Sequence, residues 1–334
     1  MRYLPRGLCG SFPRVTDLFL RLTPDWVLKS VEAAGFEPSG HCLALNSLEN
    51  RVYDLRLEDG THVVAKFYRP QRWSKEAILD EHRFLLELKE SEIPVCAPLV
   101  FKDGATLHEV EGIWYAVWPR TGGRAPDELD DEQVEMLGRL LGRIHNVGAS
   151  HPAAARRTLD AATYVREPVS FLKAGRFLPP EWESRYLKAA DAIAVAYERE
   201  AKGVPRHRIH GDCHLGNLLR GKDGFFFLDY DDMLMGPAVQ DVWMLLGGRD
   251  EEAVRQREVF LEAYRQFRPF QHRWLRLIEP LRALRFIHYS AWIARRWHDP
   301  AFPHAFPHFD TAQYWERETI DLEAQVNLIE SADH

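Results

Sequence analysis

Chemically active side chains are concentrated in residues 206–230, which read RHRIHGDCHLGNLLRGKDGFFFLDY. Two short apolar runs in this stretch flank Gly221-Lys222-Asp223-Gly224, a sequence typical of a hairpin turn. Such a hairpin brings Asn217, before its first strand, close to Asp229, after its second. Asp212 lies on the loop that leads into the first strand. The stretch therefore predicts two carboxylates and one carboxamide at one end of a β ribbon.

Asp231 and Asp232 follow Asp229, so three carboxylates fall close together. Like charges at this spacing repel one another unless a cation binds between them. Mg²⁺ is usually held by one or two carboxylates together with phosphates and water. We therefore predict Asn217 and Asp229 as metal ligands and Asp212 as the group that orients an accepting hydroxyl, a set that suits phosphoryl transfer.

A zinc site built from His210, Asp212 and His214 is the alternative for the same stretch. It lacks a fourth ligand in the sequence and leaves Asn217 and the second aspartate without a role. We expect His210 to support the loop through hydrogen bonds, and Cys213 and His214 to pack within it.

A lysine inside an apolar strand supplies the second candidate group. Lys66 lies within HVVAKFY, and a lysine in such a run is unusual without a partner. Glu81 falls on the apolar stripe of the next predicted helix, 75–90, where an unpaired carboxylate is costly. The prediction is that Lys66 contacts nucleotide phosphates and pairs with Glu81; Glu76 is the alternative partner, and a lysine on the open face of a half-buried sheet is the plainer reading.

The connection between the first two predicted strands, LNSLENRVYDL (45–55), contains no glycine. No G-x-x-x-x-G-K-[ST] phosphate loop occurs in the chain. Backbone amides with Ser47 or Asn50 are therefore predicted to cover the nucleotide phosphates. A plain hairpin remains the alternative for this segment.

The elements that must position these groups fall into two parts. Strand-like sequence covers 41–46, 51–57, 62–68 and 99–119, the last broken by turns at Asp103-Gly104 and Glu111-Gly112. Helices are predicted at 24–34 and 75–90. After Pro119-Arg120-Thr121-Gly122-Gly123 the pattern becomes helical, over 127–148, 180–201, 250–267 and 281–297. We predict an α+β, bilobal fold: an N-terminal lobe with an antiparallel sheet (1–118) and a mainly helical C-terminal lobe (119–334) that together form one catalytic unit.

Composition limits the class of protein. The 334 residues carry 43 basic and 50 acidic side chains, a formal net charge of −7, so no nucleic-acid partner is expected. The four cysteines, Cys9, Cys42, Cys96 and Cys213, are widely spaced, which indicates a reduced compartment. No apolar run predicts a signal peptide or a membrane span. The expectation is a cytoplasmic protein, monomeric and without a membrane partner.

The spacing of His210, Asp212 and Asn217, followed by Asp229, resembles the catalytic and metal-binding loops of the protein-kinase-like superfamily. HGDCHLGN is similar to the aminoglycoside phosphotransferase and choline kinase branch, as are Gly236-Pro237 and Asp241 downstream. NSLENRVYDL, AKFYRP, AVWPRTGGR, LDYDDMLMGPAVQDVWMLL and RFIHYSAWIARRWHDPAFPHAFP resemble the bacterial stress response kinase A family, over roughly residues 12–325.

This resemblance implies a choline-kinase-like fold and a protein kinase of stress responses that uses ATP and Mg²⁺ on Ser or Thr residues. It makes Asp212 catalytic, Asn217 and Asp229 ligands of Mg²⁺, and Lys66 a contact of ATP, with Asp241 bracing the catalytic loop. Leu215 departs from the proline that many relatives carry. The alternatives are a small-molecule kinase for an aminoglycoside, choline or a homoserine-like alcohol, a nucleotide-binding module without catalysis, and a zinc hydrolase.

The acceptor site has the weakest sequence signal. Aromatic and basic residues alternate over 281–315: Arg282, Arg285, Trp292, Arg295, Arg296, Trp297, Tyr314 and Trp315. They line an acceptor cleft, or they belong to a packed pair of helices with solvated arginines. The acidic motif region is compatible with a cationic acceptor.

Overall fold

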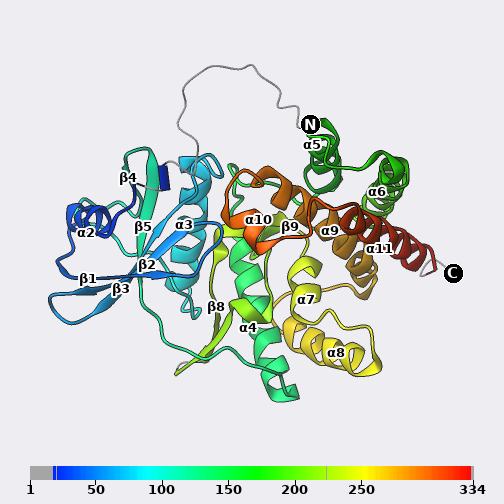
Figure 1. The fold of residues 1–334 in the computed structure, drawn as a ribbon. Helices are drawn as coiled ribbons and strands as arrows, with labels where there is room; N and C mark the ends of the chain where they lie inside the picture. Colours follow the sequence, from blue (N-terminus) through cyan, green and yellow to red (C-terminus); the bar gives the residue numbers. More distant parts are fainter. Residues whose placement is uncertain (1–17, 20, 223, 332–334) are drawn as a thin grey trace, which may run out of the picture. The chain divides into compact units, whose positions relative to one another are not determined.

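The computed structural model describes residues 18–19, 21–222 and 224–331, which divide into two compact units (Figure 1). One unit comprises residues up to Lys75 and Pro98–Arg120, and the other comprises Glu76–Ala97 and the chain from Thr121 onward. Cys9 lies outside the described residues. The division into lobes at residue 118 stays a prediction, because the compact units interleave along the chain.

The first unit contains a five-stranded antiparallel sheet with the order β1-β2-β3-β5-β4. Its strands are β1 (Pro38–Leu45), β2 (Arg51–Leu57), β3 (His62–Phe67), β4 (His108–Val110) and β5 (Ile113–Pro119). The prediction of strand from residue 99 was too long, since only β4 and β5 form there. The Leu99 N–H still donates to the Val117 carbonyl at 2.8 Å, but the chain then closes into a tight turn, in which the Phe101 N–H donates to the Ala105 carbonyl at 2.7 Å.

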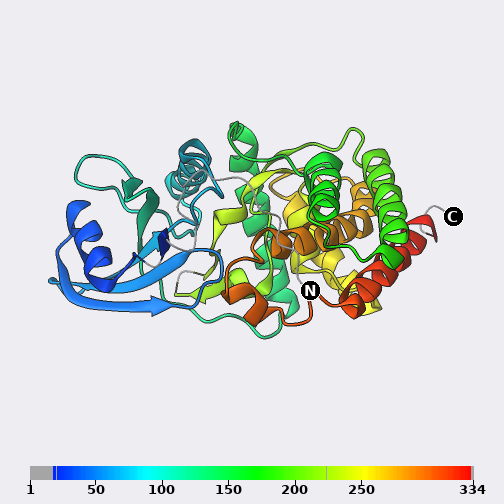
Figure 2. The same cartoon turned by 45° about the horizontal axis from the view of Figure 1, so that its top comes forward.

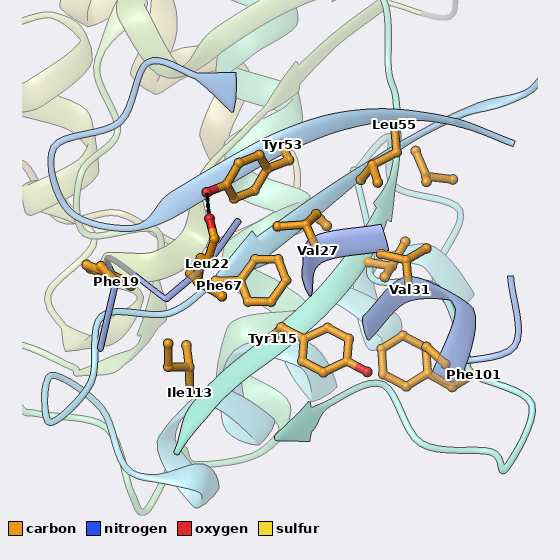
Figure 3. Packing of buried hydrophobic residues seen from close by; sticks show 14 residues of the cluster. Phe19, Leu22, Val27, Val31, Tyr53, Leu55, Phe67, Phe101, Ile113 and Tyr115 are labelled. Carbon is orange, nitrogen blue, oxygen red and sulfur yellow. Dashed lines mark hydrogen bonds between the residues drawn. The ribbon is translucent and has the colours of Figure 1, made fainter. Parts of the chain in front are cut away.

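The core of this unit lies between the sheet and helix α2 (Pro24–Ala33), as Figure 3 shows. Val27 and Val31, one helical turn apart, are fully buried there beside Phe67 and Tyr115, whose rings stack at 5.3 Å. The Tyr115 hydroxyl donates to the Ser30 carbonyl at 2.7 Å, so a buried polar atom is satisfied by the helix it packs against.

The second unit is mainly helical, and no helix among the described residues is long and apolar enough to cross a membrane. Two short antiparallel ribbons interrupt the helices: β6 (His207–Ile209) pairs with β9 (Leu234–Gly236), and β7 (Leu218–Gly221) pairs with β8 (Gly224–Phe227). Figures 1 and 2 both show α11 beside α9 and α6. The helices are α3 (Lys75–Glu90), α4 (Asp131–Ser150), α5 (Glu167–Ala174), α6 (Pro180–Glu200), α7 (Val239–Leu245), α8 (Glu251–Arg265), α9 (Ile278–Arg295), α10 (Ala301–Ala305) and α11 (Ala312–Ser331).

Helix α4 forms the scaffold behind the ribbons. Its N-terminus carries a capping box between Asp130 and Gln133. Gly138 lets α4 approach α8 closely, because a Cβ at this position would lie 2.4 Å from the Phe260 carbonyl oxygen. This contact places His145 of α4 in the buried interior below the candidate site.

Candidate active site

The predicted hairpin is present as β7 (Leu218–Gly221) and β8 (Gly224–Phe227). Leu218 pairs with Phe227, and one residue further the Leu228 N–H donates to the Asn217 carbonyl at 2.8 Å. This register places Asn217 beside the residue that precedes Asp229. The hairpin thus brings the predicted metal ligands to the same end of the ribbon, while Asp223 of its turn lies outside the described residues.

The loop that carries Asp212 follows β6 (His207–Ile209) and depends on Gly211. Gly211 has φ +84°, and a Cβ there would lie 2.4 Å from the Asp232 carbonyl oxygen. Both carboxylate oxygens of Asp241 hold the loop: Oδ2 accepts from the His210 N–H at 2.8 Å and Oδ1 from the Gly211 N–H at 2.9 Å. Asp241 therefore braces the backbone next to Asp212.

Asp241 is itself held by a buried network. Its Oδ2 lies 3.1 Å from His145 Nε2, and His145 Nδ1 lies 2.9 Å from the Tyr264 hydroxyl. Burial lowers the pKa of His145, and the adjacent Asp241 offsets this only in part, so the ring is neutral at pH 7. A neutral ring that donates to Asp241 through Nε2 accepts the Tyr264 proton at Nδ1, which fixes its tautomer.

His210 supports the loop through hydrogen bonds, as predicted. Its Nε2 lies 2.8 Å from the Leu228 carbonyl oxygen, and its Nδ1 accepts from the Asp212 N–H at 3.3 Å. Among the described residues, no group of three His, Cys, Asp or Glu side chains is placed to hold a metal ion. The zinc alternative therefore has no support in the geometry.

Asp212 lies between two basic side chains that sequence reasoning did not pair with it. Arg285 of α9 approaches Oδ1 at 2.9 Å, and His214 Nε2 lies 3.3 Å from Oδ2. The His214 ring packs within the loop as expected, between the Asp212 carboxylate and Gly216, and Cys213 is fully buried as expected. Burial alone raises the pKa of Asp212, but the His214 hydrogen bond and the Arg285 charge together bring it well below its usual range.

The side chains predicted as metal ligands have a suitable donor chemistry. Asn217 donates through Nδ2 to the Asp212 carbonyl at 3.0 Å. The loop therefore holds the amide nitrogen, and the amide oxygen is the atom that can serve as a metal ligand. Asp229 has a left-handed backbone, with φ 57° and ψ 66°, which re-aims the chain directly after β8. One carboxylate and one amide oxygen fit Mg²⁺, which takes its remaining ligands from phosphate and water.

A buried arginine that sequence reasoning missed links α3 to the segment after Asp229. Arg156 donates to Glu81 Oε2 at 2.9 Å, to the Ala77 carbonyl at 2.7 Å and to the Asp231 carbonyl at 2.6 Å. The side chains of Arg156 and Glu81 are 0% and 1% exposed. The predicted cost of a carboxylate on this apolar helix face is thus offset by a guanidinium from the same unit, and the pairing of Glu81 with Lys66 stays a prediction.

Lys66 lies in the middle of β3, paired with Val52 on one side and Ala116 on the other. It is buried, as its apolar neighbours predict, and its Nζ lies 4.9 Å from the centroid of the Tyr68 ring. The Lys66 ammonium group therefore lies over the face of the Tyr68 ring. A buried ammonium group is costly unless an opposite charge lies near it.

In the glycine-free turn between β1 and β2, the polar side chains accept hydrogen bonds from backbone N–H groups. Ser47 Oγ accepts from the Asn50 N–H at 3.2 Å, and the Asn50 side chain accepts from the Arg69 N–H at 3.1 Å. Arg69 also donates to the Glu49 carbonyl at 2.9 Å. Contact of Ser47 or Asn50 with a nucleotide stays a prediction.

Comparison with known proteins bears on the whole chain. The model of the phosphotransferase enzyme family matches residues 41–278. Stress response kinase A of Escherichia coli (strain K12) is 41% identical over 315 residues, which cover 93% of this chain and 95% of the relative. The serine/threonine protein kinase RdoA of Salmonella typhimurium is 41% identical over 312 residues, covering 93% and 94%. The chain belongs to the stress response kinase A family, and it is a kinase.

Solved structures share the fold at lower identity. Amicoumacin kinase hAmiN, solved with AMP-PNP, Ca²⁺ and amicoumacin, matches with a TM-score of 0.69 and 19% identity, over 90% of this chain and 95% of that one. Choline kinase LicA from Streptococcus pneumoniae matches with a TM-score of 0.63 and 18% identity, over 90% and 99%. The kinase-like fold, with an antiparallel N-terminal sheet and a helical C-terminal part, is confirmed.

Proposed function

We propose that this protein is an ATP- and Mg²⁺-dependent serine/threonine protein kinase that acts in a stress response. The observation that carries the proposal is the braced loop 210–217, in which Asp241 fixes the backbone and the ionised Asp212 is held by Arg285 and His214. Its relatives that bear the name of a stress response or serine/threonine kinase match it over more than nine-tenths of their length.

In this account Asp212 accepts a hydrogen bond from the acceptor hydroxyl and aims its oxygen at the γ-phosphorus. The lowered pKa of Asp212 keeps the carboxylate ionised at neutral pH, so it is available as an acceptor. It takes up the hydroxyl proton as the new P–O bond forms and the bond between the γ-phosphorus and the departing oxygen of ADP breaks. Arg285 and His214 fix the carboxylate orientation. Most of the rate enhancement then comes from positioning.

Asn217 and Asp229 would hold Mg²⁺, and Lys66 would contact the phosphates of ATP. Bound Mg²⁺ would neutralise charge on the phosphate oxygens. Arg156 ties the segment after Asp229 to α3 through the Asp231 carbonyl, so this arginine limits the freedom of the metal-binding aspartate. Glu81, held by the same arginine, is the proposed partner of Lys66.

The test is incubation of the purified protein with γ-labelled ATP and Mg²⁺, first with generic protein substrates and then with a panel of small alcohols. The expected result is label on serine or threonine of a protein substrate, and no label when EDTA is present. Label on a small alcohol alone would replace the protein kinase with a small-molecule kinase. Absence of label on every acceptor, with ATP bound, would contradict the kinase activity itself.

A further inference from the structure

Arg285 of α9 covers one oxygen of the Asp212 carboxylate. Its Nη2 lies 2.9 Å from Oδ1, which is buried. Among the described residues none donates a hydrogen bond to Oδ1, so the guanidinium lies close to this oxygen without aiming an N–H bond at it. The other oxygen is engaged, since Oδ2 accepts from Asn217 Nδ2 at 3.4 Å and lies 3.3 Å from His214 Nε2. Oδ1 is therefore the oxygen left for an acceptor hydroxyl, and the hydroxyl reaches it only when the guanidinium moves.

The Arg285 side chain is held loosely on a fixed backbone. Its neighbours in α9, Leu284 and Ile287, are buried, so the helix stays in place. The side chain itself is 39% exposed. Besides the pair with Asp212, its polar contact within the described part of the chain is a long hydrogen bond from Nη1 to Met244 Sδ at 3.8 Å, and sulfur is a weak acceptor. The guanidinium can thus leave Oδ1 without any change in the helix.

Phosphoryl transfer places a new anion within reach of Arg285. A hydroxyl that is hydrogen-bonded to Oδ1 has its oxygen about 2.7 Å from it. The γ-phosphorus then lies about 3–3.5 Å from the hydroxyl oxygen, so the transferred group is within roughly 6 Å of Oδ1. Since the guanidinium starts 2.9 Å from the same oxygen, rotation about the bonds of its long side chain brings it to the phosphoryl oxygens.

The negative charge moves in the same direction during the reaction. Before transfer, the ionised Asp212 is the anion that pairs with Arg285. When the acceptor proton passes to Oδ1, the carboxylate becomes neutral and the guanidinium loses its anion. Negative charge then lies on the phosphoryl oxygens, as the bond from phosphorus to the acceptor oxygen forms and the bond to ADP breaks. A guanidinium binds such oxygens in a bidentate manner.

Other side chains that the sequence places near the acceptor have different surroundings. Arg282, one turn before Arg285, is paired with Glu279 of the same helix at 3.3 Å. Trp315 is buried. Arg285 is thus the side chain of this region that the structure brings to the Asp212 carboxylate.

We propose that Arg285 is a catalytic residue, which passes from the Asp212 carboxylate to the transferred phosphoryl group when the acceptor hydroxyl binds at Oδ1. The proposal rests on Asp212 as the catalytic carboxylate of the proposed kinase. Before the acceptor binds, Arg285 keeps Oδ1 covered. During transfer, its guanidinium stabilises the charge on the phosphoryl oxygens, and Arg285 itself changes its ion-pair partner without a change in covalent bonds.

The test is release of labelled phosphate from γ-labelled ATP with Mg²⁺, measured as kcat and KM. Water replaces the acceptor hydroxyl in this reaction, so the assay does not depend on the identity of the acceptor. The native chain is compared with Arg285→Ala, Asp212→Asn and the double variant. Arg285→Ala should lower kcat by about 10²-fold, the size expected for one group that stabilises transition-state charge. In the Asp212→Asn background, Arg285→Ala should still lower kcat by at least about tenfold.

This further loss separates contact with the phosphoryl group from an effect through Asp212. If Arg285 only orients Asp212, Arg285→Ala has no effect once Asp212 is Asn, and that result would overturn the proposal. An unchanged or higher kcat in Arg285→Ala alone, as expected for a mere cover, would also overturn it. Label on casein, measured in parallel, reports the protein kinase activity separately, because hydrolysis without protein label contradicts the proposed acceptor and leaves the comparison of Arg285 variants decisive.

Two further variants control for charge and for folding. Arg285→Lys keeps the charge but lacks the planar fork, so it should remain at least about tenfold slower than the native chain. Guanidinium ion, added below the concentration that unfolds the chain, should raise the rate of Arg285→Ala severalfold and leave Arg285→Lys unchanged; equal effects on both would count against the proposal. Arg317→Ala removes an 85% exposed guanidinium of α11 and should act like the native chain. Urea unfolding of each variant separates loss of catalysis from loss of fold.

Discussion

The loop 210–217 and the turn 46–50 both carry polar side chains that the sequence assigns to phosphate chemistry, but they use them differently. In the loop, the backbone is held by Asp241, a residue from another element, and Asp212 keeps its carboxylate for charged partners. In the turn, Ser47 and Asn50 accept hydrogen bonds from backbone N–H groups of the turn and of Arg69.

This difference indicates which side chains remain able to contact a ligand. A loop whose backbone is held by another element leaves its own side chains for a ligand, whereas a turn whose side chains already accept backbone N–H groups offers mainly backbone amides. Substitutions in the loop and its supports should therefore reduce transfer strongly, and substitutions in the turn should reduce it weakly. The predictions below test this contrast.

The largest effect is expected for Asp229→Asn. Loss of the carboxylate removes the only charged ligand in the proposed metal pair, so transfer should fall by about 10²–10³-fold and its dependence on Mg²⁺ concentration should shift upward. Rates measured across a Mg²⁺ series check this, with Asp191→Asn on the exposed face of α6 as the charge-matched control. An unchanged Mg²⁺ dependence would contradict the assignment of Asp229 as a ligand of Mg²⁺.

Asp241→Asn tests whether bracing from outside matters. The amide retains one oxygen but turns an NH₂ group toward a backbone N–H or toward His145, so one buried donor loses its acceptor. We expect a loss of about 1–3 kcal/mol in the free energy of unfolding. A displaced loop lowers transfer by up to about 10²-fold. Urea unfolding and labelled-ATP assays on one preparation measure both; full activity would show that the brace is dispensable.

Two substitutions of Arg156 distinguish the effect of its charge on stability from the effect of its hydrogen bonds on the position of Asp229. Arg156→Lys keeps a cation near Glu81 but cannot reach the Ala77 and Asp231 carbonyls together, so transfer should fall about tenfold with the fold retained. Arg156→Gln leaves Glu81 buried without its cation and should cost about 3–5 kcal/mol of stability. Mg²⁺ titration of the lysine variant reports positioning of Asp229; equal stability of both variants would contradict the role of the ion pair.

Ser47→Ala should have the smallest effect. It removes the acceptor of one N–H in the turn, at a cost of about 0.5–1.5 kcal/mol, and transfer should change by less than about threefold. The KM for ATP is the measurement. An increase of tenfold or more would place Ser47 in contact with phosphate and would end the contrast between the two loops.

The sequence predicts the local elements of this chain well, because each has a periodic or turn signal. The β7–β8 hairpin, the strands around Lys66 and the long helices follow from alternation, Asp-Gly turns and apolar stripes. The prediction fails in 99–107, where the turn expected at Asp103-Gly104 forms but the residues on either side of it are not strands.

The sequence indicated that the motif residues lie near one another and gave no sign of the residues that support them; the roles of the motif residues stay predictions. Asn217 and Asp229 flank one hairpin, so their spacing is sufficient to bring them to the same end of the ribbon, and Asp212 lies on the loop that leads into it. Arg285 and Arg156 reach the same region from segments that are distant along the chain, and pairing over such distances depends on tertiary packing. The only available signal was the cost of a buried Glu81, which required a cation; the sequence offered Lys66 for this role and gave no sign of Arg156.

The most direct test of the account is phosphoryl transfer by Asp212→Asn, with Asp191→Asn as the control for loss of an exposed charge. Asp212→Asn should transfer at least about 10²-fold more slowly than the native chain. Its unfolding midpoint and its binding of AMP-PNP should be unchanged, and the control should act like the native chain. Native transfer rates in Asp212→Asn would contradict the assignment of this carboxylate as the catalytic group.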